Sequence, residues 1–114
     1  MSKYKVTILH TDKEPTTHVV EGSDGPDFKD MYKLMGCSTI EITGARFNNK
    51  NYDLYIDEEG RLKDGNEFNP IATEHFVEWL SHEGRVTMIP NVVGVAATVS
   101  YTHHRAHETA DNLV

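Results

Sequence analysis

Hydrophobic and polar residues alternate at the start of the chain with the two-residue period of a β-strand. Tyr4, Val6 and Ile8 are separated by polar residues, and successive side chains of a strand point to opposite faces. We therefore expect a first strand that places these three side chains in the core. Residues 17–21 predict a second strand that pairs with the first as a hairpin.

The middle of the chain predicts two more strands. Residues 39–43 alternate and end at Gly44, so Ile40 and Ile42 are expected to point inward. The next segment also alternates and runs into an acidic turn that ends in a glycine. We expect its core side to consist of Tyr52, Leu54 and Ile56. The solvent-facing side is expected to consist of Asp53, Tyr55 and Asp57.

Two segments have the spacing of amphipathic helices, and the first is short. Residues 28–35 carry apolar side chains at i, i+3, i+4 and i+7, which form one stripe on a helix. Ser23 or Asp24 is expected to cap its N-terminus. Gly36 is expected to end it, because glycine readily takes the left-handed conformation found after a helix.

The second predicted helix has clear start and stop signals. Asn69 can cap it with a side-chain oxygen, and Pro70 suits the first helical position because the missing N–H needs no partner there. Gly84 can end the helix. Its buried side is expected to consist of Ala72, Phe76, Trp79 and Leu80.

The valine-rich run at 91–99 predicts a central strand that is covered on both faces, and 86–89 is a further strand candidate. Together these elements predict an α+β fold with a mainly antiparallel sheet of five or six strands and two helices packed on one face. We expect a single domain over 1–100 and a histidine-containing C-terminal tail over 101–114.

Composition narrows the possible partners and the compartment. A net charge of −7 at pH 7 argues against direct nucleic-acid binding, which needs clustered lysine and arginine. The single cysteine, Cys37, cannot form an intrachain disulfide. The chain shows neither the apolar run of a signal peptide nor a stretch near the roughly 20 apolar residues of a membrane span. We therefore expect a cytoplasmic protein without membrane attachment.

Three residues of the second predicted helix are candidates for a metal site. His75, Glu78 and His82 lie at i, i+3 and i+7, and two imidazoles with a carboxylate suit zinc or iron. However, seven residues of helix cover about 10 Å of axis, so a solvent-exposed helix face is the alternative. We expect no other cofactor. A second histidine cluster lies in the tail at His103, His104 and His107.

Acidic residues gather in two parts of the sequence, before and within the first helix and at the acidic turn. If they share one face, they could imitate the phosphates of a duplex and bind a basic groove on a partner. Scattered negative charge that only keeps the protein soluble is the alternative. The residues of this candidate acidic face are Asp24, Asp27, Asp30, Asp57, Glu58 and Glu59.

Three segments resemble a family of small uncharacterised proteins, a domain of unknown function, from phages, plasmids and bacteria. They are 55–63 (YIDEEGRLK), 69–73 (NPIAT) and 90–95 (PNVVGV), and the resemblance covers most of 4–97. This chain differs from the family in a longer gap before the last strand and in its histidine-bearing tail. The family has no assigned catalytic residue. The resemblance implies a mobile-element origin and an accessory role in a host cytoplasm.

These observations lead to one expected function and two alternatives. We expect a non-enzymatic phage accessory protein that inhibits or sequesters a host or defence component, either a protein or a small nucleotide signal. The first alternative is a small metal-dependent enzyme that uses His75, Glu78 and His82. The second is a structural or assembly module that forms a defined homo-oligomer.

Overall fold

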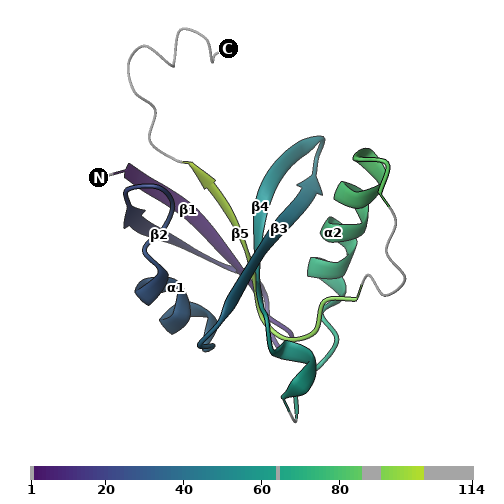
Figure 1. The fold of residues 1–114 in the computed structure, drawn as a ribbon, viewed down its shortest axis with the longest axis horizontal. Helices are drawn as coiled ribbons and strands as arrows, with labels where there is room; N and C mark the ends of the chain where they lie inside the picture. The colour runs from purple at the N-terminus through teal and green to yellow at the C-terminus, as the bar shows by residue number, and fades with distance from the viewer. Residues whose placement is uncertain (1, 64, 86–90, 102–114) are drawn as a thin grey trace, which may run out of the picture.

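The protein is described here from a computed structural model that covers residues 2–63, 65–85 and 91–101 (Figure 1). It contains five strands, two α-helices and one short 3-10 helix in these residues. In chain order they are β1 (Ser2–Leu9), β2 (Thr16–Gly22), α1 (Phe28–Met35), β3 (Ile40–Phe47), β4 (Lys50–Asp57), the 3-10 helix (Gly60–Leu62), α2 (Pro70–His82) and β5 (Ala96–Tyr101).

The strands form one antiparallel sheet in the order β2-β1-β5-β4-β3. β1 and β2 are one hairpin, β3 and β4 are another, and β5 pairs with β1 on one side and β4 on the other. This confirms the predicted α+β class with a five-stranded antiparallel sheet and two helices. The valine-rich run does lead into the central strand, although the strand itself is Ala96–Tyr101. The strand expected at 86–89 lies outside the described residues.

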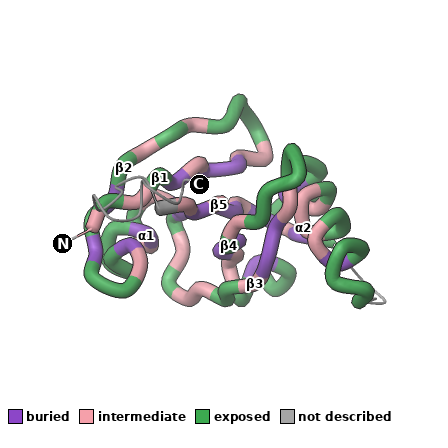
Figure 2. The backbone as a smooth tube through the Cα atoms, turned by 90° about the horizontal axis from the view of Figure 1, so that it is seen from above, coloured by how far each residue is buried: buried purple, intermediate pink, exposed green. Residues whose placement is uncertain are grey.

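The two helices pack on opposite faces of the sheet, so the prediction that both lie on one face is wrong. Met31 of α1 belongs to a core cluster with Ile8 of β1, whereas Ala72 of α2 belongs to a second cluster with Leu9. Ile8 and Leu9 are neighbours in one strand and therefore point to opposite faces. Figures 1 and 2 show α1 and α2 on the two sides of the sheet. Apolar side chains on both faces of the central strands need this double cover.

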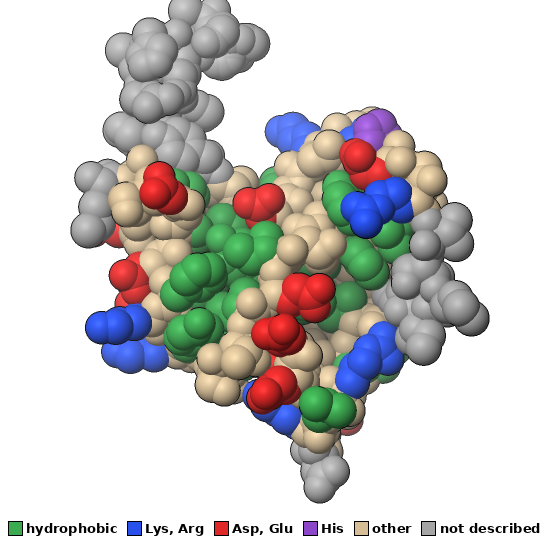
Figure 3. Space-filling model, viewed as in Figure 1, with side chains coloured by type: hydrophobic (Ala, Val, Ile, Leu, Met, Phe, Trp, Pro, Cys, Tyr) green, Lys and Arg blue, Asp and Glu red, His purple; other side chains and the backbone are tan. Residues whose placement is uncertain are grey.

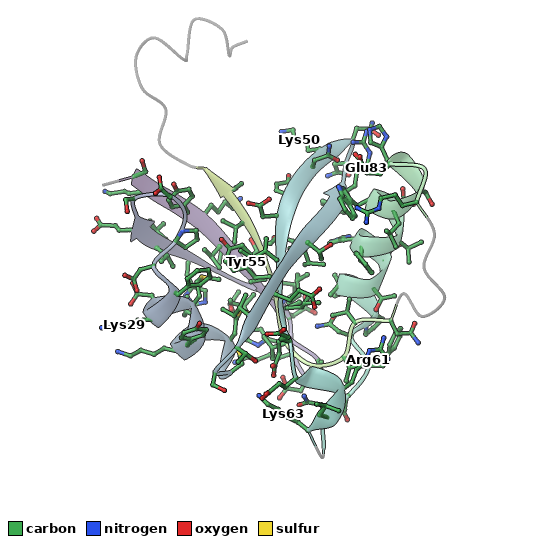
Figure 4. The ribbon with its side chains drawn as sticks, viewed as in Figure 1. Lys29, Lys50, Tyr55, Arg61, Lys63 and Glu83 are labelled. Carbon is green, nitrogen blue, oxygen red and sulfur yellow. The ribbon has the colours of Figure 1, made fainter. Side chains whose placement is uncertain are left out.

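The side chains of β4 show why the expected division into a core side and a water side fails. Leu54 is buried as expected, but Tyr55, which the alternation places in water, is only 4% exposed. Tyr55 lies in the centre of the molecule in the cluster around α1 (Figure 4), with its ring centroid 6.1 Å from that of Phe28. Conversely, Ile42, which the alternation places in the core, is 48% exposed. Ile40 still packs against the α1 cluster, and Ile42 lies outside it.

Asp27 caps the short helix α1. Its carboxylate accepts hydrogen bonds from the backbone N–H groups of Lys29, at 2.8 Å, and of Asp30. The prediction of Ser23 or Asp24 as the cap is therefore wrong, because the helix starts directly after Asp27. The predicted C-terminal end is correct, since Gly36 is left-handed with φ 68°.

Asn69 caps α2 as expected, but it also joins three parts of the fold. Its side-chain oxygen accepts from the N–H of Ala72 at 3.1 Å. Its amide nitrogen donates to the backbone oxygens of Leu9, at 2.8 Å, and Gly94, at 2.9 Å. Asn69 is fully buried. The start of α2 is therefore fixed to the end of β1 and to the segment before β5.

Helix α2 runs alongside the edge strand β3. Trp79 packs directly over Gly44 of β3, where a Cβ atom would lie 2.1 Å from the ring carbon Cε2. The guanidinium group of Arg85 also packs on the Trp79 ring, with its central carbon 5.5 Å from the ring centre. α2 covers Leu9 of β1 and Ala96 of β5 on its own face. Because it lies over the edge of the sheet, it leaves the rest of this face of β1 and β5 open, around Lys5, Thr7, Thr98 and Ser100.

Candidate functional site

A groove of about 440 Å³ lies between the first turns of α2 and the open part of the sheet. Its floor comes from β1 and β5, and its wall comes from α2, the end of β3 and Tyr52 of β4. Small-molecule sites are typically about 300–1,000 Å³ in volume and combine an apolar lining with a few placed polar groups. The groove has this size and this mixture of residues.

The register of β1 against β5 builds the floor of the groove. Lys5 is paired with Ser100, and Thr7 is paired with Thr98. Directly paired residues of antiparallel strands lie on the same face. One ammonium and three hydroxyl groups therefore line one surface, and Leu9 continues it as an apolar end. Hydroxyl groups can donate and accept, so this floor suits a ligand with mixed hydrogen-bonding groups.

The wall of the groove is mainly aromatic and apolar. Ile71, Glu74 and His75 lie at i, i+3 and i+4, which places them on one side of α2. Phe47 comes from the end of β3, and its ring centroid is 4.7 Å from that of His75 at an interplanar angle of 45°. Tyr52 of β4 adds a third ring to the lining. The groove therefore offers ring surfaces opposite a polar floor.

The imidazole of His75 in the wall has a lowered pKa and a buried nitrogen without a hydrogen-bond partner in the described residues. Burial lowers the pKa of its imidazole, and the neighbouring Glu74 carboxylate opposes this shift, so the neutral form is favoured near pH 7. Its Nδ1 atom is buried and has no hydrogen-bond partner within the described part of the chain. Burying an unpaired polar group costs about 1–3 kcal/mol. A ligand that supplied a partner to this nitrogen would recover part of that cost.

The structure does not bring all three of His75, Glu78 and His82 together. His75 and Glu78 line one hollow beside the turn between β3 and β4, and His82 is not part of its lining. His75 is half-buried against Phe47, whereas Glu78 and His82 are exposed. Across the described residues, no group of three or more His, Cys, Asp or Glu side chains is arranged to hold a metal ion. The histidine cluster of the tail lies outside those residues.

The candidate acidic residues lie in two groups at opposite ends of α1. Asp27 caps its N-terminus. Asp57 is paired with Ile40, which follows the C-terminal end of α1, and forms an ion pair with Lys63 at 2.6 Å. An eight-residue helix is about 12 Å long. Figure 4 shows Lys29, beside the first group, well separated from Lys63, beside the second. The other members of the two groups are exposed: Asp24, Asp30, Glu58 and Glu59.

The surface on the side shown in Figure 3 mixes charges and apolar groups. Three acidic groups lie next to one another near the lower middle of this view, and hydrophobic and basic groups separate them from the other acidic side chains. Asp57 also has a local role, because its carboxylate accepts a hydrogen bond from the N–H of Glu59 at 2.9 Å and so holds the turn after β4. The carboxylates of Asp27 and Asp57 are therefore already engaged by their own fold.

Cys37 lies just after α1 and is half-buried against the α1 cluster. Burial raises the pKa of its thiol, and the charge of Asp57 adds to this effect while Lys63 opposes it. A thiol with a raised pKa is mainly protonated at neutral pH and a poor nucleophile. The side chain acts as a small apolar group in the core.

Comparisons with known proteins add no further information on this site. No protein-family model, curated protein or solved structure matches the chain. The resemblance to the phage, plasmid and bacterial family therefore stays a prediction. No helix in the described residues is long and apolar enough to cross a membrane.

Sequence reasoning did not identify the groove, because its parts are far apart in the chain. Lys5, His75 and Thr98 come from three different elements, and only the strand register and the docking of α2 bring them to one place. The one available signal was the alternation in β1, which places Lys5 and Thr7 on the face opposite the core cluster around α1.

Proposed function

We propose that the protein is a binding protein that holds a small anionic aromatic compound, of the nucleotide class, in the groove beside α2. The observation that carries this proposal is the combination of ring surfaces on the wall with a lysine and three hydroxyl groups on the floor. Bound in this way, the compound would be withdrawn from other proteins. Sequestration of a host or defence nucleotide signal is the form of the proposal that agrees with the family resemblance.

The wall supports binding of a planar ring. Phe47, Tyr52 and His75 present three ring surfaces to the groove, and stacking of a base on an aromatic side chain contributes about 1–3 kcal/mol. Phe47 is 50% exposed, so its ring has room to turn against a ligand. Glu74 offers a carboxylate that can accept a hydrogen bond from an amino or hydroxyl group of the ligand.

The floor supports binding of the anionic part. Lys5 is exposed at the edge of the floor, and an ammonium group about 4 Å from a phosphate contributes about 1 kcal/mol in water and about 4 kcal/mol near a protein surface. The hydroxyl groups of Thr7, Thr98 and Ser100 lie within the same lining and can donate hydrogen bonds to phosphate oxygens. The wall therefore suits the base of a nucleotide, and the floor suits its phosphate.

Nuclear magnetic resonance tests this proposal directly. The protein labelled with nitrogen-15 is titrated with a panel of purine and pyrimidine mono-, di- and cyclic nucleotides. At least one compound is expected to shift the amide signals of Thr7, His75 and Thr98 while leaving those of α1 in place. If no nucleotide of the panel shifts any groove signal at millimolar concentration, the proposal is contradicted.

A pair of lysine variants separates specific binding from general charge attraction. Lys5→Ala is expected to remove at least about 1 kcal/mol of attraction to the anion. Since 1.4 kcal/mol corresponds to a factor of ten, binding should weaken by about fivefold or more. Lys29→Ala is the matched control, because Lys29 is an exposed lysine on α1, which packs on the other face of the sheet (Figure 4). Equal losses in the two variants would show that the groove does not place the anion.

A further inference from the structure

A cluster of two histidines and one threonine lies at the closed end of the β1–β2 hairpin. His10 directly follows β1, and Thr16 and His18 belong to β2. The hydroxyl oxygen Oγ1 of Thr16 is 2.9 Å from Nε2 of His10 and 3.0 Å from Nε2 of His18. Two imidazole nitrogens from neighbouring strands therefore point at one shared oxygen atom.

Strand register explains this convergence and separates the cluster from the groove. Ile8 is paired with Thr16, and Val6 is paired with His18. Val6 and Ile8 belong to the core cluster around α1, so Thr16 and His18 lie on the face opposite the groove. His10 follows Ile8 by two residues and continues that face. All three members of the cluster are partly buried, which limits the directions in which the rings can turn.

We propose that His10 and His18 form a two-histidine site for a divalent transition metal ion such as Zn²⁺ or Ni²⁺, with water in the remaining coordination positions. Imidazole nitrogen is a preferred ligand for both ions. A zinc–nitrogen bond is about 2.1 Å long, so the two Nε2 atoms must come within roughly 4 Å of each other. Both already lie within 3.0 Å of the Thr16 hydroxyl. For one ion to bind both nitrogens, the rings must turn toward each other, and the ion then replaces the two hydrogen bonds to the Thr16 hydroxyl.

A metal ion binds imidazole in its neutral form. The Thr16 hydroxyl has one hydrogen, so it donates to only one of the two imidazoles. Burial lowers the pKa of His10, Lys13 and His18 lower it further, and Asp12 opposes them. Asp12 also brings a negative charge close to the site, while the charge of Lys13 works against a bound cation.

The site differs from the histidine sites that the sequence suggested. It uses neither the α2 residues His75, Glu78 and His82 nor the tail. Its sequence signal is a His at the end of one strand and a Thr-x-His pattern on the next, which becomes a cluster only when the hairpin pairs in this register. The metal site also does not depend on ligand binding in the groove beside α2, since the two lie on opposite faces of the sheet.

The imidazole signals of the full-length protein provide the first test. Long-range proton–nitrogen spectra are recorded during titration with zinc chloride, and separately with nickel chloride. The ring signals of His10 and His18 are expected to change together and to level off at one ion per site. To remove competing imidazoles, the same titration is run on a background in which the three tail histidines are replaced: His103→Gln, His104→Gln and His107→Gln. Unchanged His10 and His18 signals at millimolar zinc would overturn the proposal.

Single substitutions on that background give the second test. His10→Gln and His18→Gln are each expected to weaken zinc binding by more than about tenfold, the loss that follows removal of even an outer-shell partner of a metal site. His82→Gln is the control, because His82 is an exposed histidine at the end of α2. Retained binding in both hairpin variants, with amide spectra that show a folded protein, would refute the site. Their loss of binding with an unchanged control would support it.

Discussion

Replacing Asn69 with alanine should destabilise the whole domain, because one buried side chain connects three separate parts of the chain. Asn69 caps α2 through the N–H of Ala72 and donates to the backbone oxygens of Leu9 and Gly94. It is fully buried. In Asn69→Ala the helix loses its cap, and two carbonyl oxygens lose a donor in a place where water does not reach the original side chain.

The size of the effect follows from these three bonds. Loss of an N-cap costs about 0.5–2 kcal/mol. Leaving a buried polar group without a partner costs about 1–3 kcal/mol, and relaxation of the two carbonyl groups reduces that cost. We expect Asn69→Ala to lower the free energy of unfolding by about 3–5 kcal/mol, a large part of the roughly 5–15 kcal/mol of a typical domain.

Urea denaturation followed by Trp79 fluorescence measures this change. Asp27→Ala is the matched control: Asp27 caps α1 in the same way but is exposed, so its loss should cost only about 1 kcal/mol. Asn69→Asp adds a second comparison, since it keeps the oxygen that accepts from Ala72 but places a carboxylate against two carbonyl oxygens. It should be at least as unstable as Asn69→Ala at pH 7. A loss below about 1.5 kcal/mol in Asn69→Ala, or a loss equal to that of Asp27→Ala, would refute this reasoning.

Three further predictions concern single residues. Gly44→Ala should lower the free energy of unfolding by about 1–3 kcal/mol and change the fluorescence of Trp79, because the new methyl group collides with the indole ring; an unchanged urea midpoint would contradict this. Burial lowers the pKa of His75 in the folded state, so its stabilising contribution is complete above the unfolded pKa of about 6.5 and is lost as the pH falls below that value. The free energy of unfolding should therefore decrease as the pH falls from about 7 to about 5. His75→Gln should make this decrease smaller without removing it, because burial also lowers the pKa of His10. Urea titrations at several pH values would count against this if the free energy of unfolding changed equally with pH in both proteins. Burial raises the pKa of the Cys37 thiol, so its reaction with an aromatic disulfide reagent at pH 8 should be slower by about tenfold or more in the native protein than in urea; comparable rates would show that the thiol is open.

The elements of the fold could largely be predicted from local signals, and their packing could not. The alternation around Val6, the cap at Asn69 and the glycine at Gly36 each state a conformation that depends on near neighbours in the chain. The face on which a helix docks depends on distant residues. Tyr55 looks like a solvent-facing position in a polar context, and it is buried because α1 covers the side of β4 that the pattern assigns to water.

The candidate sites show the same division more sharply. The sequence indicated His75 because it lies beside other ionisable residues on one helix, but the structure places it in a groove with Lys5 and Ser100 from the two strands farthest apart in the chain. Likewise, His10 and His18 converge only through hairpin register. Alternation predicts the face of the sheet on which a side chain lies, but it does not predict which residue of the next strand lies beside it. A site formed by residues of two strands can therefore be predicted only when the strand register is known.

The position of β5 in the middle of the sheet has a consequence for biosynthesis. Each hairpin can form as soon as its own two strands have left the ribosome, but only β5 connects one hairpin to the other. Until it emerges, β1 and β4 each present an unpaired inner edge, and unpaired edges readily pair with strands of other chains. During synthesis, the two hairpins therefore stay separate until β5 joins them. A ribosome pause shortly before residue 96 would prolong the period in which their unpaired edges can pair with strands of other chains.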